Sequence, residues 1–303
     1  MKKIATWTAI LALSLVMTSC SLSRGGGEVS PSAQPSAAEE RNISVEVYSL
    51  STGINVISKA IKEIKVSQQP NVDLIKHMLL ANDHLFSNKI EVLDVTSQND
   101  TAKIDFSAEM AQQPAENLVY AAELCAMTLS QSQPVTAVSL TAEGTPIPDM
   151  AYYPSRLVTK SSDLNIPVRM FTLYFPDKQA TGLLAEYRLM PLEDGADYTV
   201  VSELLAGTSD FENKINIIPQ GTKINSVTTD NGLCTIDFSQ EFIRNHTGGS
   251  ASDSLVIYSI VNALTELESC QNVQFLVNGN KYVTFGGYGL DQPFERKEDI
   301  IVT

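Results

Sequence analysis

The chain of 303 residues spells nearly the same seven letters at two places. The sequence IDFSAEM occupies residues 104–110 and IDFSQEF occupies residues 236–242, and five of the seven positions are identical. Such a repeat is explained either by a duplicated active site or by a duplicated fold. The sequence on both sides of each motif decides between these two explanations.

Similar helices precede the two motifs. Apolar residues at helical spacing predict helices over residues 71–82 and 197–207. Both helices end in Leu-Leu-Ala, which is followed by Asn82 in the first and by Gly207 in the second. Because Asn and Gly best tolerate the left-handed conformation that commonly ends a helix, we expect both helices to end in the same way.

Each motif is predicted to form the second strand of a hairpin. Alternation places an apolar set on one face of this strand in each copy, namely Ala102, Ile104 and Phe106, and Cys234, Ile236 and Phe238. Asp105 and Asp237 then face the other way. Polar turns such as residues 229–232 join the strands of each pair.

The elements after the motif also correspond. A second helix is predicted over residues 116–130 and over 252–269. A closing strand is predicted over residues 138–144 and over 273–279. The offset between the copies is 132 residues at the motif and 135 residues at the closing strand. These similar offsets indicate a duplicated domain with the order β-β-α-β-β-α-β in each copy.

Six short motifs occur in order over residues 166–295 of the second copy, namely FTLYFPD, GLLAEYRL, SELLAGT, CTIDFS, FLVNG and TFGG. With these motifs the second copy resembles a GerM domain. The first copy departs from the pattern, because Asn82 replaces the glycine that ends the helix and SVEVYSL stands for the first strand. It also ends at GTPIP without an equivalent of TFGG.

The resemblance implies a tandem GerM lipoprotein of the kind associated with sporulation and spore germination in endospore-forming bacteria. It also implies an α+β fold similar to the ring-building motif, in which two helices pack on a three- to four-stranded sheet in a two-layer domain. We expect a first GerM-like domain over residues 42–160, a second GerM domain over 166–295, and a C-terminal tail over 296–303.

The N-terminus has the features of an export signal. Lys2 and Lys3 precede an apolar run over residues 4–17, which is shorter than the roughly 20 residues needed to span a bilayer core. The segment that ends at Cys20 resembles the lipobox of bacterial lipoproteins, in which the cysteine is acylated and becomes the first residue after cleavage. We therefore expect a lipoprotein signal peptide over residues 1–20 with lipid at Cys20. A plain signal peptide with an incidental cysteine is the alternative.

Composition and charge constrain the location and the partners. Residues 21–41 are rich in Gly, Ser, Pro and Ala, which predicts a flexible tether and an extracytoplasmic body anchored to the cell membrane by its lipid. The formal charge of −14 becomes −16 without Lys2 and Lys3 and disfavours nucleic acid. We expect partners among envelope proteins or other copies of the chain.

The repeated motif also contains two carboxylates four residues apart, a pair that a glycosidase would place on either side of the scissile bond. These pairs are Asp105 with Glu109 and Asp237 with Glu241. An acid at a strand end more often accepts backbone N–H bonds in the following turn, and a neighbouring serine does the same. We therefore interpret the repeated acid and serine as fold residues rather than catalysts, at Asp105, Ser107, Asp237 and Ser239.

The other candidate motifs are weaker. His77, His84 and His246 lack the spacing of a metal site, so we expect neither a metal nor another cofactor. The run over residues 246–254 lacks the lysine of a phosphate loop, and no helix pattern follows the glycines of residues 285–289 as a dinucleotide-binding motif requires.

Three cysteines remain after Cys20, which is an odd number for an exported protein. Cys125 lies on the apolar stripe of a predicted helix and is interpreted as a core residue. A bridge between Cys234 and Cys270 is compatible with the sequence, although nothing in the sequence requires it.

Two classes of function remain. The favoured one is a noncatalytic, membrane-tethered scaffold or assembly factor in an envelope complex of sporulation or germination. The alternative is a binding module for a cell-wall glycan or a small ligand, and a cell-wall hydrolase is a weaker possibility. Because an enzyme needs convergent catalytic groups and the sequence shows no such set, we do not expect an enzyme.

Overall fold

The computed structural model describes residues 41–302 except residues 52, 54, 193, 194 and 282. The described residues belong to one compact unit. The predicted signal peptide, the acylation of Cys20 and the tether before residue 41 lie outside the described residues.

The helices and strands of the first copy follow the predicted order. In chain order they are β1 (Arg41–Ser51), β2 (Val56–Val66), α1 (Pro70–Ala81), β3 (Val92–Gln98), β4 (Thr101–Phe106), the 3-10 turn η1 (Ala108–Gln112), α2 (Ala115–Ser130) and β5 (Ala137–Ala142). Short elements follow, namely β6 (Thr145–Pro146), β7 (Tyr153–Pro154) and η2 (Val158–Lys160).

The second copy repeats this order. Its elements are β8 (Asn165–Pro176), β9 (Leu183–Pro191), α3 (Ala196–Ala206), β10 (Ile224–Asp230), β11 (Leu233–Phe238), α4 (Glu241–Arg244), α5 (Ser250–Leu264) and β12 (Asn272–Val277). The chain then forms β13 (Thr284–Phe285), β14 (Tyr288–Gly289), β15 (Phe294–Glu295) and η3 (Glu298–Ile300). The predicted tandem α+β architecture is confirmed.

Matching two-residue turns connect the central strands of both copies. Asn99 and Asp100 join β3 to β4 with φ of 50° and 58°, whereas Asn231 and Gly232 join β10 to β11 with φ of 48° and 83°. Two consecutive positive φ values are the mark of a type I′ turn, whose twist matches that of the flanking strands and which favours Asn, Asp and Gly. The local sequence therefore fixes the register of these hairpins.

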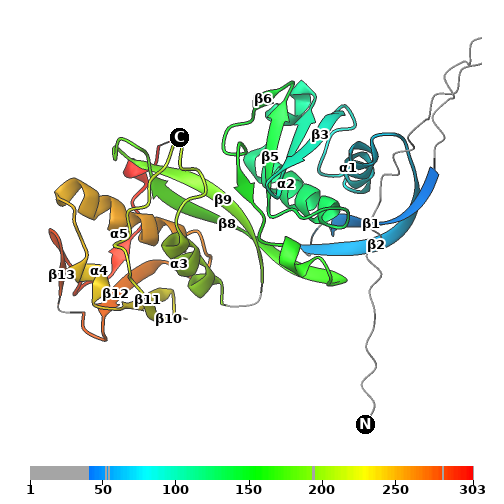
Figure 1. Ribbon diagram of the computed structural model, residues 1–303. Coiled ribbons are helices and arrows are strands. Elements are labelled where there is room, and N and C mark those ends of the chain that lie inside the picture. The colour runs from blue at the N-terminus through cyan, green and yellow to red at the C-terminus, as the bar shows by residue number, and fades with distance from the viewer. Residues whose placement is uncertain (1–40, 52, 54, 193–194, 282, 303) are drawn as a thin grey trace, which may run out of the picture. The chain divides into compact units, whose positions relative to one another are not determined.

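Each copy has a small sheet with helices on its inner face. In the first copy β4 pairs with β3 in antiparallel and with β5 in parallel orientation, and β11 pairs with β10 and β12 in the same way. The inward residues Ile104 and Ile236 are fully buried, as the alternation predicts. Figure 1 shows α1 and α2 between the β3-β4-β5 sheet and the β1-β2 hairpin, so the hairpin adds a further layer to the predicted two.

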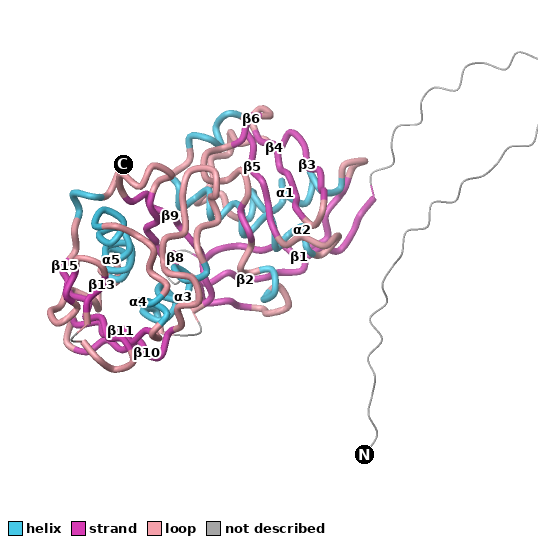
Figure 2. Tube along the Cα trace, turned by 60° about the vertical axis from the view of Figure 1, so that its left-hand side comes forward, coloured by secondary structure: helices cyan, strands magenta, loops and turns pink. Residues whose placement is uncertain are grey.

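The β8-β9 hairpin serves both copies. Its strand β8 pairs with β2 through residues 165–167, which extends the β1-β2 hairpin into a sheet of order β1-β2-β8-β9 (Figures 1 and 2). Val168 and Leu189, at one end of the hairpin, are buried in the first hydrophobic core. Leu173 and Leu183, toward the other end, are buried in the second. A single pair of strands thus completes two cores.

The last residues pack on the second copy. Leu183 bridges to Ile301, and the Val302 N–H donates to the Leu183 carbonyl at 2.8 Å. Ile300 and Ile301 are partly buried against the second core. The segment that follows residue 295 therefore belongs to the folded body.

The shared hairpin predicts where two matched substitutions act. Leu189→Ala removes buried methyl groups from the first core, which costs about 2–5 kcal/mol, and Leu183→Ala does the same in the second core. Hydrogen exchange measured by mass spectrometry should accelerate mainly in α2 for Leu189→Ala and mainly in α5 for Leu183→Ala. Equal acceleration of both helices in both variants would show that the hairpin does not divide between the cores.

Candidate functional site at the junction of the two copies

The repeated Asp and Ser hold backbone groups in equivalent places. One carboxylate oxygen of Asp105 accepts the Gly144 N–H at 2.8 Å, and Asp237 accepts the Gly279 N–H at 2.9 Å. The sequence predicted donors in the turn that directly follows each acid. The observed donors belong instead to the turn after the neighbouring parallel strand, β5 or β12. The bonded turn lies 39 residues along the chain from Asp105, so local sequence does not reveal it.

The two serines bind the backbone just before the first strand of each central hairpin, β3 or β10. The Ser107 hydroxyl accepts the Glu91 N–H, and the Ser239 hydroxyl accepts the Lys223 N–H, each at 3.0 Å. Hydrogen bonds from these serines also lower the pKa values of the exposed carboxyls of Glu109 and Glu241. All of these contacts recur in both copies, which supports the interpretation as fold residues.

The histidines lie apart from one another in the fold. His77 lies in α1 and His84 in the loop after it, whereas His246 precedes α5 and its ring nitrogen lies 2.6 Å from the Asp253 carboxylate. Asp253 also accepts the Gly287 N–H at 3.0 Å, and a Cβ atom at Gly286 would come within 2.0 Å of its carboxylate. The pair thus anchors the glycine turn of β13 and β14. Within the described residues, no group of three or more His, Cys, Asp or Glu side chains could hold a metal ion.

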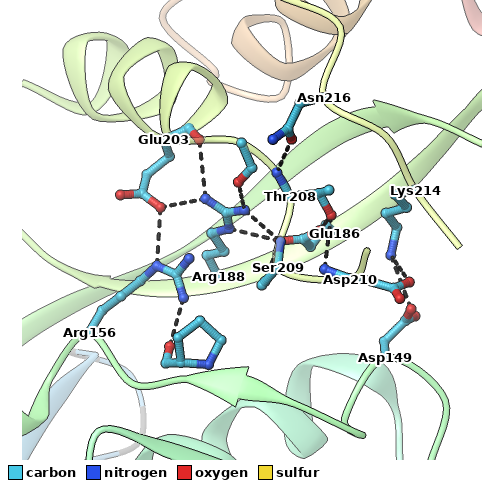
Figure 3. A network of polar contacts seen from close by, with 12 residues as sticks. Asp149, Arg156, Glu186, Arg188, Glu203, Thr208, Ser209, Asp210, Lys214 and Asn216 are labelled. Carbon is cyan, nitrogen blue, oxygen red and sulfur yellow. Dashed lines mark hydrogen bonds and ion pairs between the residues drawn. The ribbon is translucent and has the colours of Figure 1, made fainter. Parts of the chain in front are cut away.

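A network of polar contacts is centred on Arg188 of β9 (Figure 3). This side chain is fully buried, and its guanidinium donates to the Glu186 carboxylate at 2.6 and 2.9 Å. It also donates to the Glu203 carboxylate at 2.6 Å and to the Gly207 carbonyl at 2.5 Å. Because a buried charge is costly unless it is paired, Arg188 needs both carboxylates and the carbonyls at the end of α3.

Glu186 connects this cluster to the loop after α3. Its carboxylate accepts the Thr208 hydroxyl at 2.5 Å and the Ser209 hydroxyl at 2.7 Å. Burial alone raises the pKa of Glu186, but the Arg188 charge and the two hydroxyls outweigh burial and lower the pKa below its ordinary value. Glu186 is therefore a carboxylate whose charge stabilises the folded state.

Two ion pairs carry the network into the first copy. Arg156, which follows β7, donates to Glu203 of α3 at 3.1 Å. Lys214, whose side chain is almost fully buried, lies 3.0 Å from Asp149 and 3.1 Å from Asp210 (Figure 3). The two copies are thus joined by ionic contacts as well as by the shared hairpin.

The segment that carries Arg156 is itself held by a buried acid of α2. Glu123 accepts the Ser155 hydroxyl at 2.5 Å and the Arg156 N–H at 2.9 Å. Burial raises the pKa of Glu123, and these bonds offset part of the effect. A continuous set of contacts therefore runs from α2 of the first copy to α3 of the second.

The loop after α3, residues 207–223, is longer in the second copy than in the first. The offset between the copies is 125 residues at the helix ends, Ala81 and Ala206. It is 132 residues at Glu91 and Lys223, the partners of the two serines. Residues 207–223 therefore contain seven more residues than the equivalent loop of the first copy, and this longer loop supplies the side chains that reach Glu186 and the first copy.

A groove of about 580 Å³ borders the network, and Asp149 and Asp210 line it. Tyr152 and Phe211 also line this groove, and their exposed fractions are 52% and 65%. Two exposed aromatic rings beside carboxylates provide apolar and polar contacts for a small ligand. Sequence analysis did not identify this groove, because its lining residues come from separate loops of the two copies.

Comparisons with known proteins relate the chain to a family of repeated domains. A family model named Germane and described as sporulation and spore germination matches residues 33–148 and 172–283, about three quarters of the chain. None of the curated proteins compared with the chain matches it.

Three solved structures are similar to the chain at low identity. The tandem GerMN domains of the sporulation protein GerM from Bacillus subtilis share 18% identity over 86% of this chain and 100% of that chain, with a TM-score of 0.39. A putative lipoprotein from Clostridium perfringens shares 22% identity over 44% of this chain and 90% of that chain, with a TM-score of 0.32. The first GerMN domain of the Bacillus subtilis protein shares 20% identity over 42% and 98%, with a TM-score of 0.33.

The two repeated acids should have similar effects on stability. Asp105→Ala and Asp237→Ala each remove the acceptor of a backbone N–H, which costs about 1 kcal/mol and lowers the melting temperature by about 2–4 °C. Asp94→Ala, an exposed acid on β3 beside Asp105, serves as the control and should leave the melt unchanged. An unchanged melt for Asp237→Asn together with loss of a measured hydrolysis would identify an active site instead.

The lowered pKa of Glu186 predicts acid sensitivity of the fold. A carboxyl whose folded pKa lies below its unfolded value stabilises the protein above the unfolded pKa, about 4.3, and this contribution is lost as the pH falls through the folded pKa. Glu186→Gln should reduce the free energy of unfolding by about 2 kcal/mol at pH 7. The difference from the wild type should shrink toward pH 3 in denaturant titrations.

The exposed Glu212 of the same loop provides the matched control for this experiment. Glu212→Gln should follow the wild-type stability curve at every pH. A difference between Glu186→Gln and the wild type that stays constant between pH 7 and pH 3 contradicts the assignment of a charged, stabilising Glu186.

Proposed function

The chain belongs to the Germane family of sporulation and spore germination domains, and from this we propose that it acts as a noncatalytic, membrane-anchored scaffold or assembly factor in an envelope complex. The family match over both copies confirms the resemblance inferred from the sequence. The observation that carries the scaffold role is the ionic junction, because it holds two similar domains as one unit.

The junction supports this role because it fixes the spacing of two binding surfaces. The ion pairs that cross between the copies are Arg156 with Glu203 and Lys214 with Asp149. Because the Lys214 side chain is almost fully buried, separation of the copies would leave its charge with fewer partners, and these contacts therefore resist separation. Two domains held in this way present their surfaces as a rigid pair. A rigid pair favours head-to-tail association, which closes into rings or extends as filaments.

The sheet edges provide the surfaces. β3 and β10 each end the strand order of their sheet, and residues such as Thr96 and Thr228 on them are exposed. A terminal strand offers unpaired N–H and C=O groups to a strand of another chain. The duplicated fold therefore presents two equivalent edges on one molecule.

The anchor is the second part of the proposal. Among the described residues, no helix has the length and apolar character that crossing a membrane requires. We propose that lipid at Cys20 attaches the body to the outside of the cell membrane and that the predicted tether, residues 21–41, connects the two. Molecules confined near one membrane meet at a high effective concentration, so that weak contacts suffice for assembly.

Ligand binding is the second candidate, and the groove with Tyr152 and Phe211 is the observation that favours it. A cell-wall glycan or a small ligand would place a ring face on these aromatic side chains and its hydroxyl groups near Asp149 or Asp210. Titration with soluble cell-wall fragments tests this function. Binding that is lost in Phe211→Ala supports it, and a cell-wall hydrolase would in addition release fragments from the glycan.

The scaffold role predicts assembly that depends on the membrane. The lipid-free protein should sediment as a monomer or a weakly associating species, whereas the acylated protein on liposomes should give crosslinked higher oligomers, alone or with an envelope partner. Thr96→Lys and Thr228→Lys place a charge on an open edge and should reduce the crosslinked oligomers by at least half.

Two control variants separate the edges and the anchor from other effects. Gln112→Lys adds the same charge at an exposed position of η1 and should leave the oligomers unchanged. Cys20→Ala should release the protein from the membrane fraction and abolish the oligomers. A monomer under every condition would remove the scaffold role and favour ligand binding.

A further inference from the structure

Two cysteines of the second copy lie together in its core. Cys234 is in β11 and is fully buried, and Cys270, just before β12, is 4% exposed. β11 and β12 are parallel neighbours, and Cys234 pairs with Val273, three residues after Cys270. The Gln271 and Asn272 N–H groups donate to the Gly232 carbonyl at 2.7 and 3.0 Å, which holds the chain around Cys270 beside β11.

The two side chains are packed in the same hydrophobic core, and both are free thiols in the structure. The thiols of Cys234 and Cys270 share a hydrogen bond, and this bond raises the pKa of Cys234 and lowers that of Cys270. The third cysteine, Cys125, lies in α2 of the first copy and is fully buried.

The first copy shows what the fold itself needs at these positions. Ala102 of β4 corresponds to Cys234, and Val135 corresponds to Cys270, because the next two N–H groups donate to the Asp100 carbonyl in the same way. Ala102 and Val135 are buried to the same degree as the cysteines. A small apolar pair therefore satisfies the packing, and packing does not account for a pair of thiols at these two positions.

We propose that Cys234 and Cys270 form a disulfide in the exported protein. The bond would connect β11 to the segment before β12 and enclose residues 235–269, which contain α4 and α5. The inference rests on the exported location proposed above, but it does not depend on the scaffold role.

The chemistry is thiol–disulfide exchange with an external disulfide, either that of an exported thiol oxidase or glutathione disulfide. The Cys270 thiolate attacks one sulfur of the external disulfide and forms a mixed disulfide with it. The other sulfur of the external disulfide leaves as a thiolate. The Cys234 thiol then loses its proton and attacks the Cys270 sulfur, which releases the second thiolate. Two protons and two electrons leave the protein, and the external disulfide is reduced to two thiols. Because both sulfurs are buried, this exchange takes place before the core closes.

Peptide mapping tests the proposal on the full chain. Trypsin places the three cysteines in separate peptides, residues 104–156, 224–244 and 245–281. The protein is extracted from envelopes under denaturing, non-reducing conditions with an alkylating reagent and is then digested. We expect the peptides 224–244 and 245–281 to be joined, and the peptide with Cys125 to carry the alkyl group.

A matched variant separates the bond from the packing. Cys234→Ala with Cys270→Val reproduces the pair that the first copy carries, and Cys125→Ala is the control for a buried thiol elsewhere. Reduction should lower the melting temperature of the wild type and of Cys125→Ala by about 10 °C. The double variant should melt at the same temperature with and without reductant.

Refolding of the full chain with glutathione disulfide separates the failure of this inference from that of the proposed location. Free thiols at Cys234 and Cys270 after such refolding overturn the inference wherever the protein resides. A bond that forms on refolding but is missing in cells overturns both its presence in the native protein and the exported location. Joined peptides in both samples support the proposal.

Discussion

The buried charge of Arg188 is the constraint on which the junction depends. A guanidinium without access to water must be surrounded by acceptors, and Arg188 takes them from β9, from the side chain of Glu203 and from the carbonyls at the end of α3. Glu186 in turn requires the hydroxyls of the next loop. One charge thus determines the position of a strand, a helix end and a loop.

The central strands and turns of the two copies make the same contacts, whereas the loops that meet at the junction differ. The turns, the repeated Asp and the repeated Ser make the same contacts in both copies. The loop after α3 is seven residues longer than its counterpart in the first copy, and it supplies Thr208 and Ser209 to Glu186 and Asp210 to Lys214. The longer loop after α3 therefore adds ionic contacts to two copies that the shared hairpin also joins.

Sequence reasoning recovered what depends on neighbouring residues. Periodicity located the helices and strands, and Asn231-Gly232 indicated its hairpin turn, because propensity and alternation act over a few residues. The junction depends on pairs that are distant in the chain, such as Arg156 with Glu203 and Lys214 with Asp149, and no local pattern specifies such pairs. Glu186 and Arg188 did leave a signal, since two opposite charges occupy one face of an otherwise apolar strand. The sequence does not show that this face of β9 is buried, because α3, which contacts it, comes later in the chain.

The shared hairpin also determines when the first copy can finish folding. β7, the last strand of its own sheet, ends at Pro154, yet its core is completed by Leu189, 35 residues further along the chain. A chain that emerges from a ribosome N-terminus first therefore leaves this core open until the second copy begins to appear. The first copy becomes fully packed only when β9 is available, so the two halves become stable together.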